Sequence, residues 1–270
     1  MKHKKEKKKI LFISTRNPFS GRYSGDVLRS LKIIKLFKTK YDLDIACLKK
    51  KNDPIINEKN TISFDYPNFF VKIFNCIISF LKLKPIHFGL FFSKELNKFL
   101  DNNCNNYDYL FFYHIRSSQY LPKDFTGKTI IEMGDLYSEN YKQTFEFLSI
   151  LNPFKYIYYL ESLFVNKLEK KIFLNFDKVI LFSKNEIKKT PKFFKKKIFQ
   201  IDESIEKINK KFFYSNKNST ILFIGNMNYL PNFLACKDFI KNVLPEIKKE
   251  IPTIKLRVIG DISSLNKIFL

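Results

Sequence analysis

The sequence has no tryptophan, only seven glycines, and four cysteines that stand far apart in its 270 residues. So little glycine, beside ten prolines, excludes collagen-like and low-complexity chains. No cysteine pair has CxxC spacing, so neither a zinc knuckle nor a dense disulfide framework is indicated, and buried free thiols are expected. With 45% apolar residues, the chain has enough side chains to bury a sizeable core.

Long apolar runs are missing as well. The longest, residues 69–81, is interrupted by Lys72 and Asn75 and is shorter than the about 20 residues of a membrane-spanning helix. The basic residues 2–9 precede a four-residue apolar run, whereas a secretory signal needs roughly 7–15 apolar residues. We therefore expect a cytoplasmic protein that is either soluble or peripheral on the inner face of the membrane.

Acidic residues and arginine are scarce beside lysine. Lys and Arg together number 49 against 26 Asp and Glu, which gives a net charge of +23, yet only five of the 49 are arginine. Arginine is the residue that forks onto guanine edges and phosphates, so nucleic acid is not the expected partner. Two interpretations of the lysine excess stay open. The lysines either reflect AT-rich codons and lie on solvated faces, or they attract the protein to an anionic membrane surface.

The first fifty residues have the pattern of a β–α–β unit. Residues 10–14 form a continuous apolar run, which predicts a buried strand. A loop with Gly21 and Gly25 follows, then an apolar face at helical spacing up to about residue 38, with Asp26 as the expected N-cap. Residues 41–48 predict the next strand. A strand, helix and strand in this order favour a parallel sheet.

The pattern continues and then restarts. Further strands are expected at 61–66, 107–114, 128–133, 178–183 and 197–201, and helices at 69–84, 94–100, 154–176 and 184–189. After a polar stretch, a second β–α–β unit begins near residue 219, with a helix that Pro245 kinks or splits. We expect a basic tail at 1–9, an α/β domain with a Rossmann-like parallel sheet at 10–201, a linker at 202–218, and an incomplete second Rossmann-like domain at 219–270.

Two segments carry a family resemblance. The sequences ILFISTRNPFSGRYSGDVLRSLKIIKLF and ILFIGNMNYLPNFLACKDFIKNVLPEIKKEIPTIKLRVIGD resemble the openings of the two domains of GT-B glycosyltransferases of the family 4 type. Between them, IEMGDLYSENY and FDKVILFSKNE stand where that family has a strand-ending acidic residue and a strand-ending serine. The resemblance implies two Rossmann-like domains facing a cleft, with the acceptor mainly on the first and the donor nucleotide mainly on the second.

The same resemblance implies an activity. Such enzymes transfer a sugar from a nucleotide-diphosphate donor to a glycan or lipid-linked acceptor, generally with retention of configuration, and need neither a metal nor a cofactor besides the donor. Backbone N–H groups at helix N-termini, with Lys or Arg, would stabilise the departing diphosphate. The product class would be a cell-surface polysaccharide or lipid-linked glycan.

Candidate site residues stand where predicted parallel strands end. Asp135 and His114 are the candidate catalytic residues. The candidate substrate-binding residues are Gly21, Gly25, Arg29, Arg116, Gly225, Asn226 and Asn232. Other roles stay open for several of them, since a glycine in a loop also serves an ordinary turn, an arginine also lies on the surface, and a lone histidine is often structural. Ser183 is expected to cap the helix at 184–189 rather than to bind substrate.

Three departures from the family pattern leave an alternative open. The stretch IFQIDESIEK lacks the family's Asn-Gly turn, and Pro231 and Asn232 stand where many members have a lysine. The family's two glutamates, eight residues apart, would lie beyond Leu270, so the 270 residues alone are expected to show negligible turnover. The alternative is a non-catalytic remnant or binding module that retains only the acceptor-side domain. Another nucleotide-binding class is disfavoured, because neither GxGxxG nor GxxxxGK[ST] occurs.

The helix expected at 69–84 allows two further interpretations. Its apolar residues recur at helical spacing with lysines beside them, so the helix either packs on the sheet or lies in the headgroup plane of an anionic bilayer.

Overall fold

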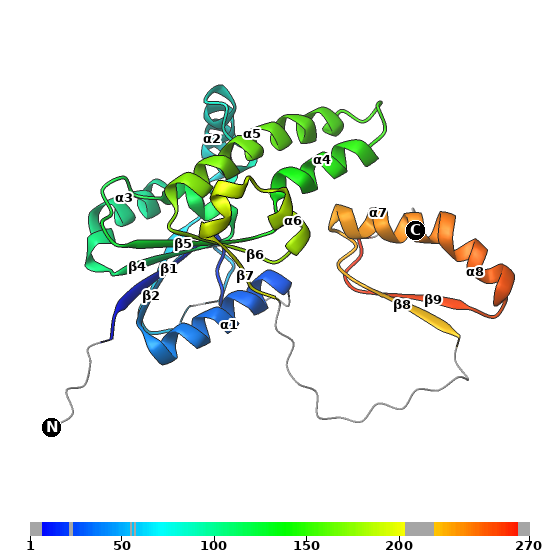
Figure 1. Ribbon diagram of the computed structural model, residues 1–270, viewed down its shortest axis with the longest axis horizontal. Helices are drawn as coiled ribbons and strands as arrows, with labels where there is room; N and C mark the ends of the chain where they lie inside the picture. Colours follow the sequence, from blue (N-terminus) through cyan, green and yellow to red (C-terminus); the bar gives the residue numbers. More distant parts are fainter. Residues whose placement is uncertain (1–6, 22–23, 55, 57, 203–218, 264–270) are drawn as a thin grey trace. The chain divides into compact units, whose positions relative to one another are not determined.

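The computed structural model describes residues 7–21, 24–54, 56, 58–202 and 219–263 (Figure 1). The chain divides into two compact units, Met1–Ser204 and Ile205–Leu270, which are described separately below. The first six residues of the expected basic tail, and the expected linker from residue 203 onward, lie outside the described residues.

The first unit is built on a parallel sheet of seven strands in the order β3-β2-β1-β4-β5-β6-β7. Every neighbouring pair is parallel. The strands are β1 (Lys9–Ser14), β2 (Asp42–Lys49), β3 (Thr61–Asp65), β4 (Tyr109–Tyr113), β5 (Lys128–Gly134), β6 (Lys178–Leu181) and β7 (Ile198–Gln200). The α/β class and the Rossmann-like parallel sheet expected from the sequence are thereby confirmed.

Both faces of this sheet are buried, which explains why its central strands are apolar without alternation. Leu11 and Ile13 of β1 belong to one core cluster, while Ile10 and Phe12 belong to the other. The helix α1 (Gly25–Lys40) covers the second face, where Ile34 packs. The remaining helices of the unit lie on the opposite face (Figure 1). They are α2 (Phe69–Leu81), α3 (Lys94–Asn103), α4 (Tyr137–Phe147), α5 (Phe154–Asn175) and α6 (Lys184–Lys189).

The ends of the helices follow capping chemistry. Ser93 and Ser183 accept hydrogen bonds from the backbone N–H groups of Leu96 and Glu186, so the two expected N-caps are confirmed. The expected cap of α1 was wrong by two residues. Ser24 is the N-cap, and Asp26 lies in the first turn, where a carboxylate is favoured by the helix dipole.

Helix α2 has no buried residue, although ten of its 13 residues are apolar or aromatic and only Lys72, Asn75 and Ser79 interrupt them. It packs on the short 3₁₀ helix η1 (Ile86–Phe91) through Gly89. A Cβ atom at Gly89 would lie 2.5 Å from the backbone carbon of Asn75, so only glycine allows this approach. Of the two interpretations of this helix, the one in which it buries its apolar face on the sheet is therefore wrong.

The second unit holds a parallel β–α–β arrangement of its own. The strands β8 (Thr220–Ile224) and β9 (Lys255–Ile259) pair in parallel, and α7 (Leu230–Asp238) and α8 (Leu244–Glu250) connect them through a π-helical turn, η5 (Phe239–Val243). Pro245 stands in the first turn of α8, so the expected break in the helix is confirmed. Several apolar strand residues of this unit are exposed: Leu222, Ile224, Val258 and Ile259.

Candidate functional site

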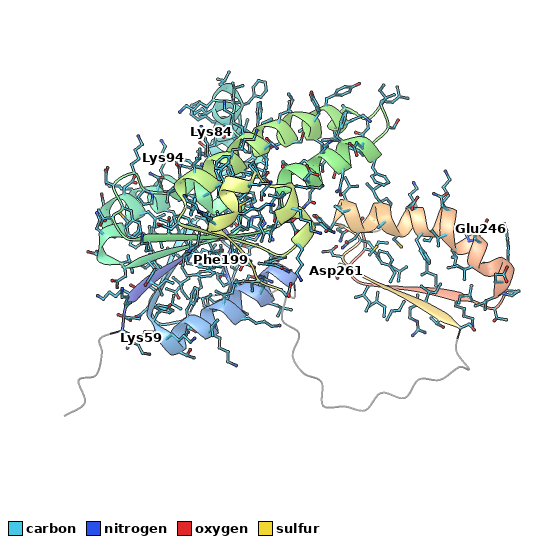
Figure 2. The ribbon with its side chains drawn as sticks, in the orientation of Figure 1. Lys59, Lys84, Lys94, Phe199, Glu246 and Asp261 are labelled. Atoms are coloured by element: carbon cyan, nitrogen blue, oxygen red, sulfur yellow. The ribbon has the colours of Figure 1, made fainter. Side chains whose placement is uncertain are left out.

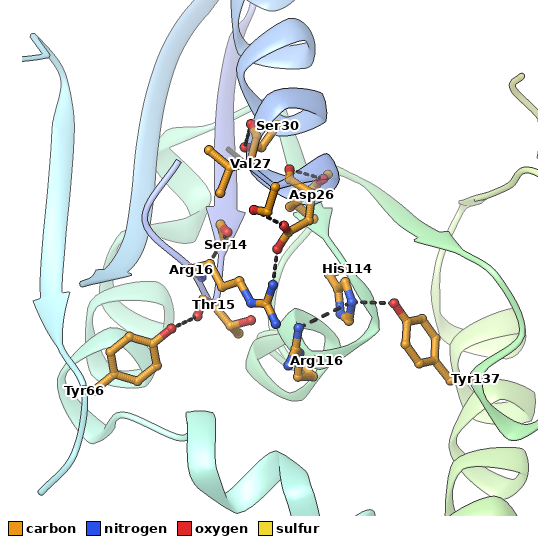
Figure 3. Close-up of polar contacts among 12 residues, drawn as sticks. Ser14, Thr15, Arg16, Asp26, Val27, Ser30, Tyr66, His114, Arg116 and Tyr137 are labelled. Carbon is orange, nitrogen blue, oxygen red and sulfur yellow. Dashed lines mark hydrogen bonds and ion pairs between the residues drawn. The ribbon is translucent and has the colours of Figure 1, made fainter. Parts of the chain in front are cut away.

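The order of the strands locates a candidate site in the first unit. The strand β1 lies between β2 and β4, and the chain proceeds from β1 to β2 on one side but reaches β4 on the other. In open parallel sheets, ligands bind at the carboxyl ends of the strands at such a point of reversal. The segments that follow β1 and β4 contain Thr15, Arg16, His114 and Arg116, which lie together in Figure 3.

His114 stands directly after β4 with backbone angles φ 74° and ψ 146°. Residues other than glycine rarely adopt this backbone conformation, which costs on the order of 1–3 kcal/mol. Residues that do adopt it are concentrated at functional sites. Three hydrogen bonds hold the backbone there. The His114 N–H donates to the Glu132 carbonyl at 2.8 Å, and its own carbonyl accepts from the backbone N–H and the hydroxyl of Ser117.

The imidazole of His114 is neutral at pH 7. Burial, followed by the positive charges of Arg116 and Arg16, holds its pKa well below the usual value. The Nε2 atom contacts the Tyr137 hydroxyl and lies 3.4 Å from Nη2 of Arg116 (Figure 3). Because Arg116 can only donate, it favours the tautomer whose proton is on Nδ1. The Nδ1 atom is buried and has no hydrogen-bond partner within the described ranges.

Arg116 is a buried cation, with 8% of its surface exposed. Its guanidinium carbon lies 4.3 Å from the centre of the Phe91 ring, a cation–π contact. Burial and the nearby charge of Arg16 lower the pKa of Arg116 to about 10, so it stays charged at neutral pH. Its Nε atom is buried, and no residue that the structure describes forms a hydrogen bond with it.

Arg16 adds a second guanidinium to the same edge of the sheet. Its side chain is 47% exposed and forms an ion pair with Asp26 in the first turn of α1. Burial alone would raise the pKa of Asp26, but the hydrogen bond from Ser24 and the charge of Arg16 outweigh it, so the pKa is lowered. The Asp26 carboxylate is therefore ionised at neutral pH.

Asp135 lies beyond the end of β5, after Gly134 with φ 80°. Its charge raises the pKa of Glu186 in α6, after the larger contribution of burial. Tyr137, two residues further on, begins α4 and contacts His114 through its hydroxyl. The structure thus connects the segment that follows β5 to the candidate site through Tyr137.

Arg29 lies inside α1 in a buried ion pair. Its Nε atom is 2.8 Å from Oε1 of Glu132, and its guanidinium carbon lies 3.6 Å from the centre of the Phe182 ring. A buried pair of this kind fixes α1 to β5, and both charges are compensated within the protein. A substrate contact of Arg29 stays a prediction.

The two glycines of the loop between β1 and α1 have open space beside them. Among the described residues, no atom lies within 4 Å of a Cβ built on Gly21 or Gly25, and Gly21 has a φ of 70°. Gly21 is thus required by the backbone conformation, whereas Gly25 at the start of α1 is not crowded. The free space agrees with their predicted place beside a ligand, which stays a prediction.

The loop after β8 in the second unit is tightly closed. A Cβ atom on Gly260, with φ 143°, would lie 1.8 Å from the carbonyl oxygen of Gly225, so the two glycines bring the ends of β8 and β9 into contact. The Asn232 side chain donates to the Asn226 carbonyl at 3.2 Å. The Asn226 side chain accepts from the backbone N–H of Asn228 at 2.8 Å. Both asparagines therefore shape the loop itself, and donor binding by them stays a prediction.

Sequence analysis missed three contributors to the first-unit site: Arg16, Tyr137 and Glu132. Arg16 had a usable signal, since it follows the first strand by two residues and is one of only five arginines. Tyr137 and Glu132 had none, because their contacts with His114 and Arg29 span 23 and 103 residues.

No group of three or more His, Cys, Asp or Glu side chains in the ranges that the structure describes is placed to hold a metal ion. None of the described helices is both long and apolar enough to cross a membrane.

Comparison with known proteins places the chain beside one curated relative and several solved structures. No model of a known protein family matches. The chain is 26% identical over 271 residues to a Klebsiella pneumoniae protein named "Uncharacterized 44.6 kDa protein in cps region". The match covers 94% of this chain and 65% of that relative, so the chain spans about two thirds of the relative's length.

Two of the three similar solved structures are named as glycosyltransferases. An alpha-glucosyltransferase bound to UDP and a 13-mer DNA with a central A:G mismatch has 12% identity and a TM-score of 0.39, over 97% of this chain and 58% of that one. The calicheamicin glycosyltransferase CalG4 has 12% identity and a TM-score of 0.44, over 96% and 67%. LpCGTa in complex with UDP has 7% identity and a TM-score of 0.39, over 97% and 72%. At these TM-scores the likeness carries no argument about this chain.

Proposed function

We propose that this chain is a glycosyltransferase that moves a sugar from a nucleotide-sugar donor to a glycan or lipid-linked acceptor in polysaccharide biosynthesis. The observation that carries the proposal is the cluster of Arg16, His114 and Arg116 where β1 and β4 end, at the point of reversal of a parallel sheet. The motifs that resemble the family 4 type lie on the matching elements, since both quoted segments begin at the first strand of a unit.

The proposal divides the two substrates between the units. The acceptor would bind at the carboxyl edge of the first sheet, where Asp135 and His114 are the candidate catalytic residues. His114 is neutral at pH 7 and so keeps a lone pair that can take a proton from an acceptor hydroxyl, although its lowered pKa makes it a weak base. Asp135 would serve as an alternative acceptor-side base.

The donor diphosphate would bind at the loop after β8, beside Gly225 and the start of α7. Negative charge develops on the leaving diphosphate as the glycosidic bond breaks, and backbone N–H groups at a helix N-terminus stabilise it. We expect a retaining reaction that needs neither a metal nor a cofactor, as the family resemblance implies.

A membrane-peripheral location fits lipid-linked acceptors. The most exposed apolar residues of α2 are Phe69, Phe70, Phe74 and Leu81, and Lys72, Lys82 and Lys84 stand on the same segment. A cavity of about 530 Å³ opens between α2, η1 and α5, and five lysines line it without an acidic residue: Lys82, Lys84, Lys94, Lys167 and Lys171. Figure 2 shows Lys84 beside α2 and Lys94 near the start of α3. Exposed aromatics with flanking lysines favour binding to anionic lipid.

Donor binding tests the proposal without relying on turnover. The purified chain is titrated with UDP, GDP, ADP and dTDP by calorimetry at fixed ionic strength. Saturable binding of one nucleoside diphosphate, weakened in Gly225→Ala and unchanged in the exposed control Lys248→Ala, is expected. Binding of none of the four would overturn the proposal.

Transfer from a radiolabelled donor then separates catalysis from the alternative of a binding module. Donor-dependent labelling of a lipid-extract acceptor that is lost in Asp135→Ala would show that the chain itself catalyses. Nucleotide and acceptor binding with no labelling would favour the module.

A further inference from the structure

The charge of Arg116 is not compensated by the part of the chain that the structure describes. No Asp or Glu in those ranges forms an ion pair with its guanidinium. Its recorded polar contact is with Nε2 of His114, which is neutral. The side chains whose charges shift the pKa of Arg116 are Arg16, Tyr66, Tyr137 and Tyr141. A buried cation is normally paired, because desolvation of an isolated charge is costly.

The fold neutralises a largely buried arginine elsewhere in the same unit. Arg29, whose side chain is 13% exposed, also stacks on a phenylalanine, Phe182, but Glu132 lies 2.8 Å from its Nε atom. Arg116 and Arg29 therefore have matched aromatic contacts and differ in the carboxylate. The missing partner of Arg116 is a local property of the candidate site, and not a general feature of arginines in this protein.

Arg116 and its neighbour His114 also lack hydrogen bonds within the described residues. The Nε atom of Arg116 and the Nδ1 atom of His114 are both buried without a hydrogen-bond partner among the described residues. Buried polar atoms are nearly always satisfied in native proteins, so two such atoms on neighbouring side chains indicate a missing group. The strained backbone of His114 points to the same place.

Arg16 supplies the accessible part of the cluster. It is half exposed, and its guanidinium lies between Asp26 and the side of the cluster that holds Arg116 (Figure 3). The two guanidinium groups and the one carboxylate leave an excess of one positive charge, because His114 is neutral. The cluster therefore attracts an anion from solvent.

We propose that Arg16 and Arg116 bind a phosphoryl group of the acceptor at the end of β1 and β4. The proposal rests on the proposed function in one respect, namely that the ligand on this unit is the acceptor. Phosphate fits better than carboxylate, because the two guanidinium groups come from different loops and a tetrahedral oxyanion presents oxygens in several directions. A sugar phosphate and a lipid-linked phosphate share this chemistry.

Binding of inorganic phosphate is the first test. The full chain is titrated with sodium phosphate, sodium pyrophosphate and sodium acetate at constant ionic strength, and binding is followed by calorimetry. Saturable binding of phosphate or pyrophosphate, at least about tenfold tighter than acetate, is expected, and Arg16→Met is expected to weaken it by roughly tenfold or more. The exposed control Lys59→Met, which removes the same charge at the opposite edge of the sheet, should leave it unchanged (Figure 2).

Absence of saturable binding, equal binding of acetate, or equal losses in Arg16→Met and Lys59→Met would each overturn the inference. Phosphate binding without any nucleotide binding would uphold this site and refute the proposed function. Nucleotide binding without phosphate binding would refute this site and uphold the proposed function. Vesicles that contain a lipid phosphate, compared with a soluble sugar phosphate, then identify which source of phosphoryl group the site prefers.

Thermal unfolding without ligand is the second test, and it does not depend on any probe. Arg116→Met keeps an unbranched side chain over Phe91 and removes an uncompensated buried charge, so the melting temperature is expected to rise by at least about 2 °C. Arg29→Met is the matched control, and its melting temperature is expected to fall by roughly 6 °C or more, because Glu132 loses its partner. A similar fall in both variants would show that Arg116 is structural and would contradict the inference.

Discussion

The Nη2 atom of Arg116 lies 3.4 Å from Nε2 of His114, just beyond the carboxyl end of β4. Through this contact, a charged guanidinium keeps a neutral imidazole in one orientation. The Tyr137 hydroxyl contacts the same nitrogen from α4, so the segment after β4 and the start of α4 meet at His114. An anion bound by Arg116 would change the electrostatic environment of the candidate base directly.

The exposed face of α2 gives a prediction about membranes. We expect the chain to co-sediment with vesicles that contain anionic lipid, and binding to weaken as salt rises, because lysine attraction is screened. Replacing Phe70 and Phe74 with serine should reduce the bound fraction at least severalfold, because their rings are 81% and 62% exposed and lose apolar contact with the bilayer.

The matched control for this experiment is Leu36→Ser. Leu36 is also exposed, at 55%, but lies on α1, on the other face of the sheet. Equal binding to neutral vesicles, no binding at low salt, or an equal loss in the Leu36 variant would rule out a membrane role for α2.

A second prediction concerns the attachment of α2. Gly89→Ala would place a methyl group against the backbone of Asn75 and Cys76, where no flexible side chain can yield. We expect the free energy of unfolding to fall by roughly 1–3 kcal/mol or α2 to detach, as overpacking generally does. Chemical denaturation and proteolysis at α2 measure this. Gly25→Ala serves as the control, since its Cβ meets open space and should cost far less.

Glu169 gives a prediction about pH. Burial raises the pKa of Glu169 from its ordinary value of 4.5 to about 7, although Ser138 donates hydrogen bonds to the carboxylate from its N–H and hydroxyl. The folded protein therefore binds this proton more tightly than the unfolded chain. Its contribution to stability is fully present below about pH 4.5 and is lost as pH rises to about 7.

The loss is on the order of 3 kcal/mol across that range. Denaturation at several pH values should show that Glu169→Gln removes this slope, whereas Glu246→Gln, an exposed control in the second unit, keeps it. A slope that persists in Glu169→Gln would contradict the assignment.

Much of the fold follows from local sequence signals. The spacing of apolar residues predicted each strand of the described residues and the 22-residue helix α5. A serine directly before each helix predicted the N-caps of α3 and α6. Helix α4 was missed, because Tyr137–Phe147 is polar and packs chiefly against α5, a contact that no local pattern reveals.

The candidate site was less accessible to sequence reasoning. His114 and Arg116 were identified from their place after a strand. The positive φ of His114, a conformation that favours glycine, depends on a hydrogen bond to the Glu132 carbonyl and on one from the Ser117 N–H, and tertiary packing supplies the first of them. The exposure of α2 was also undecided in the sequence, because an apolar helix face looks the same whether it meets a sheet or solvent.

The titration of His114 is the measurement that tests the account most directly. Imidazole NMR signals of the three histidines are assigned with the His87→Gln and His3→Gln variants and followed from pH 5 to 8, with and without phosphate. Without ligand, burial and the charges of Arg116, Arg16 and His87 should keep the His114 pKa well below 6.5. Added phosphate should raise it, since a bound anion offsets those charges. A His114 signal that titrates near 6.5 and does not respond to phosphate would contradict the account.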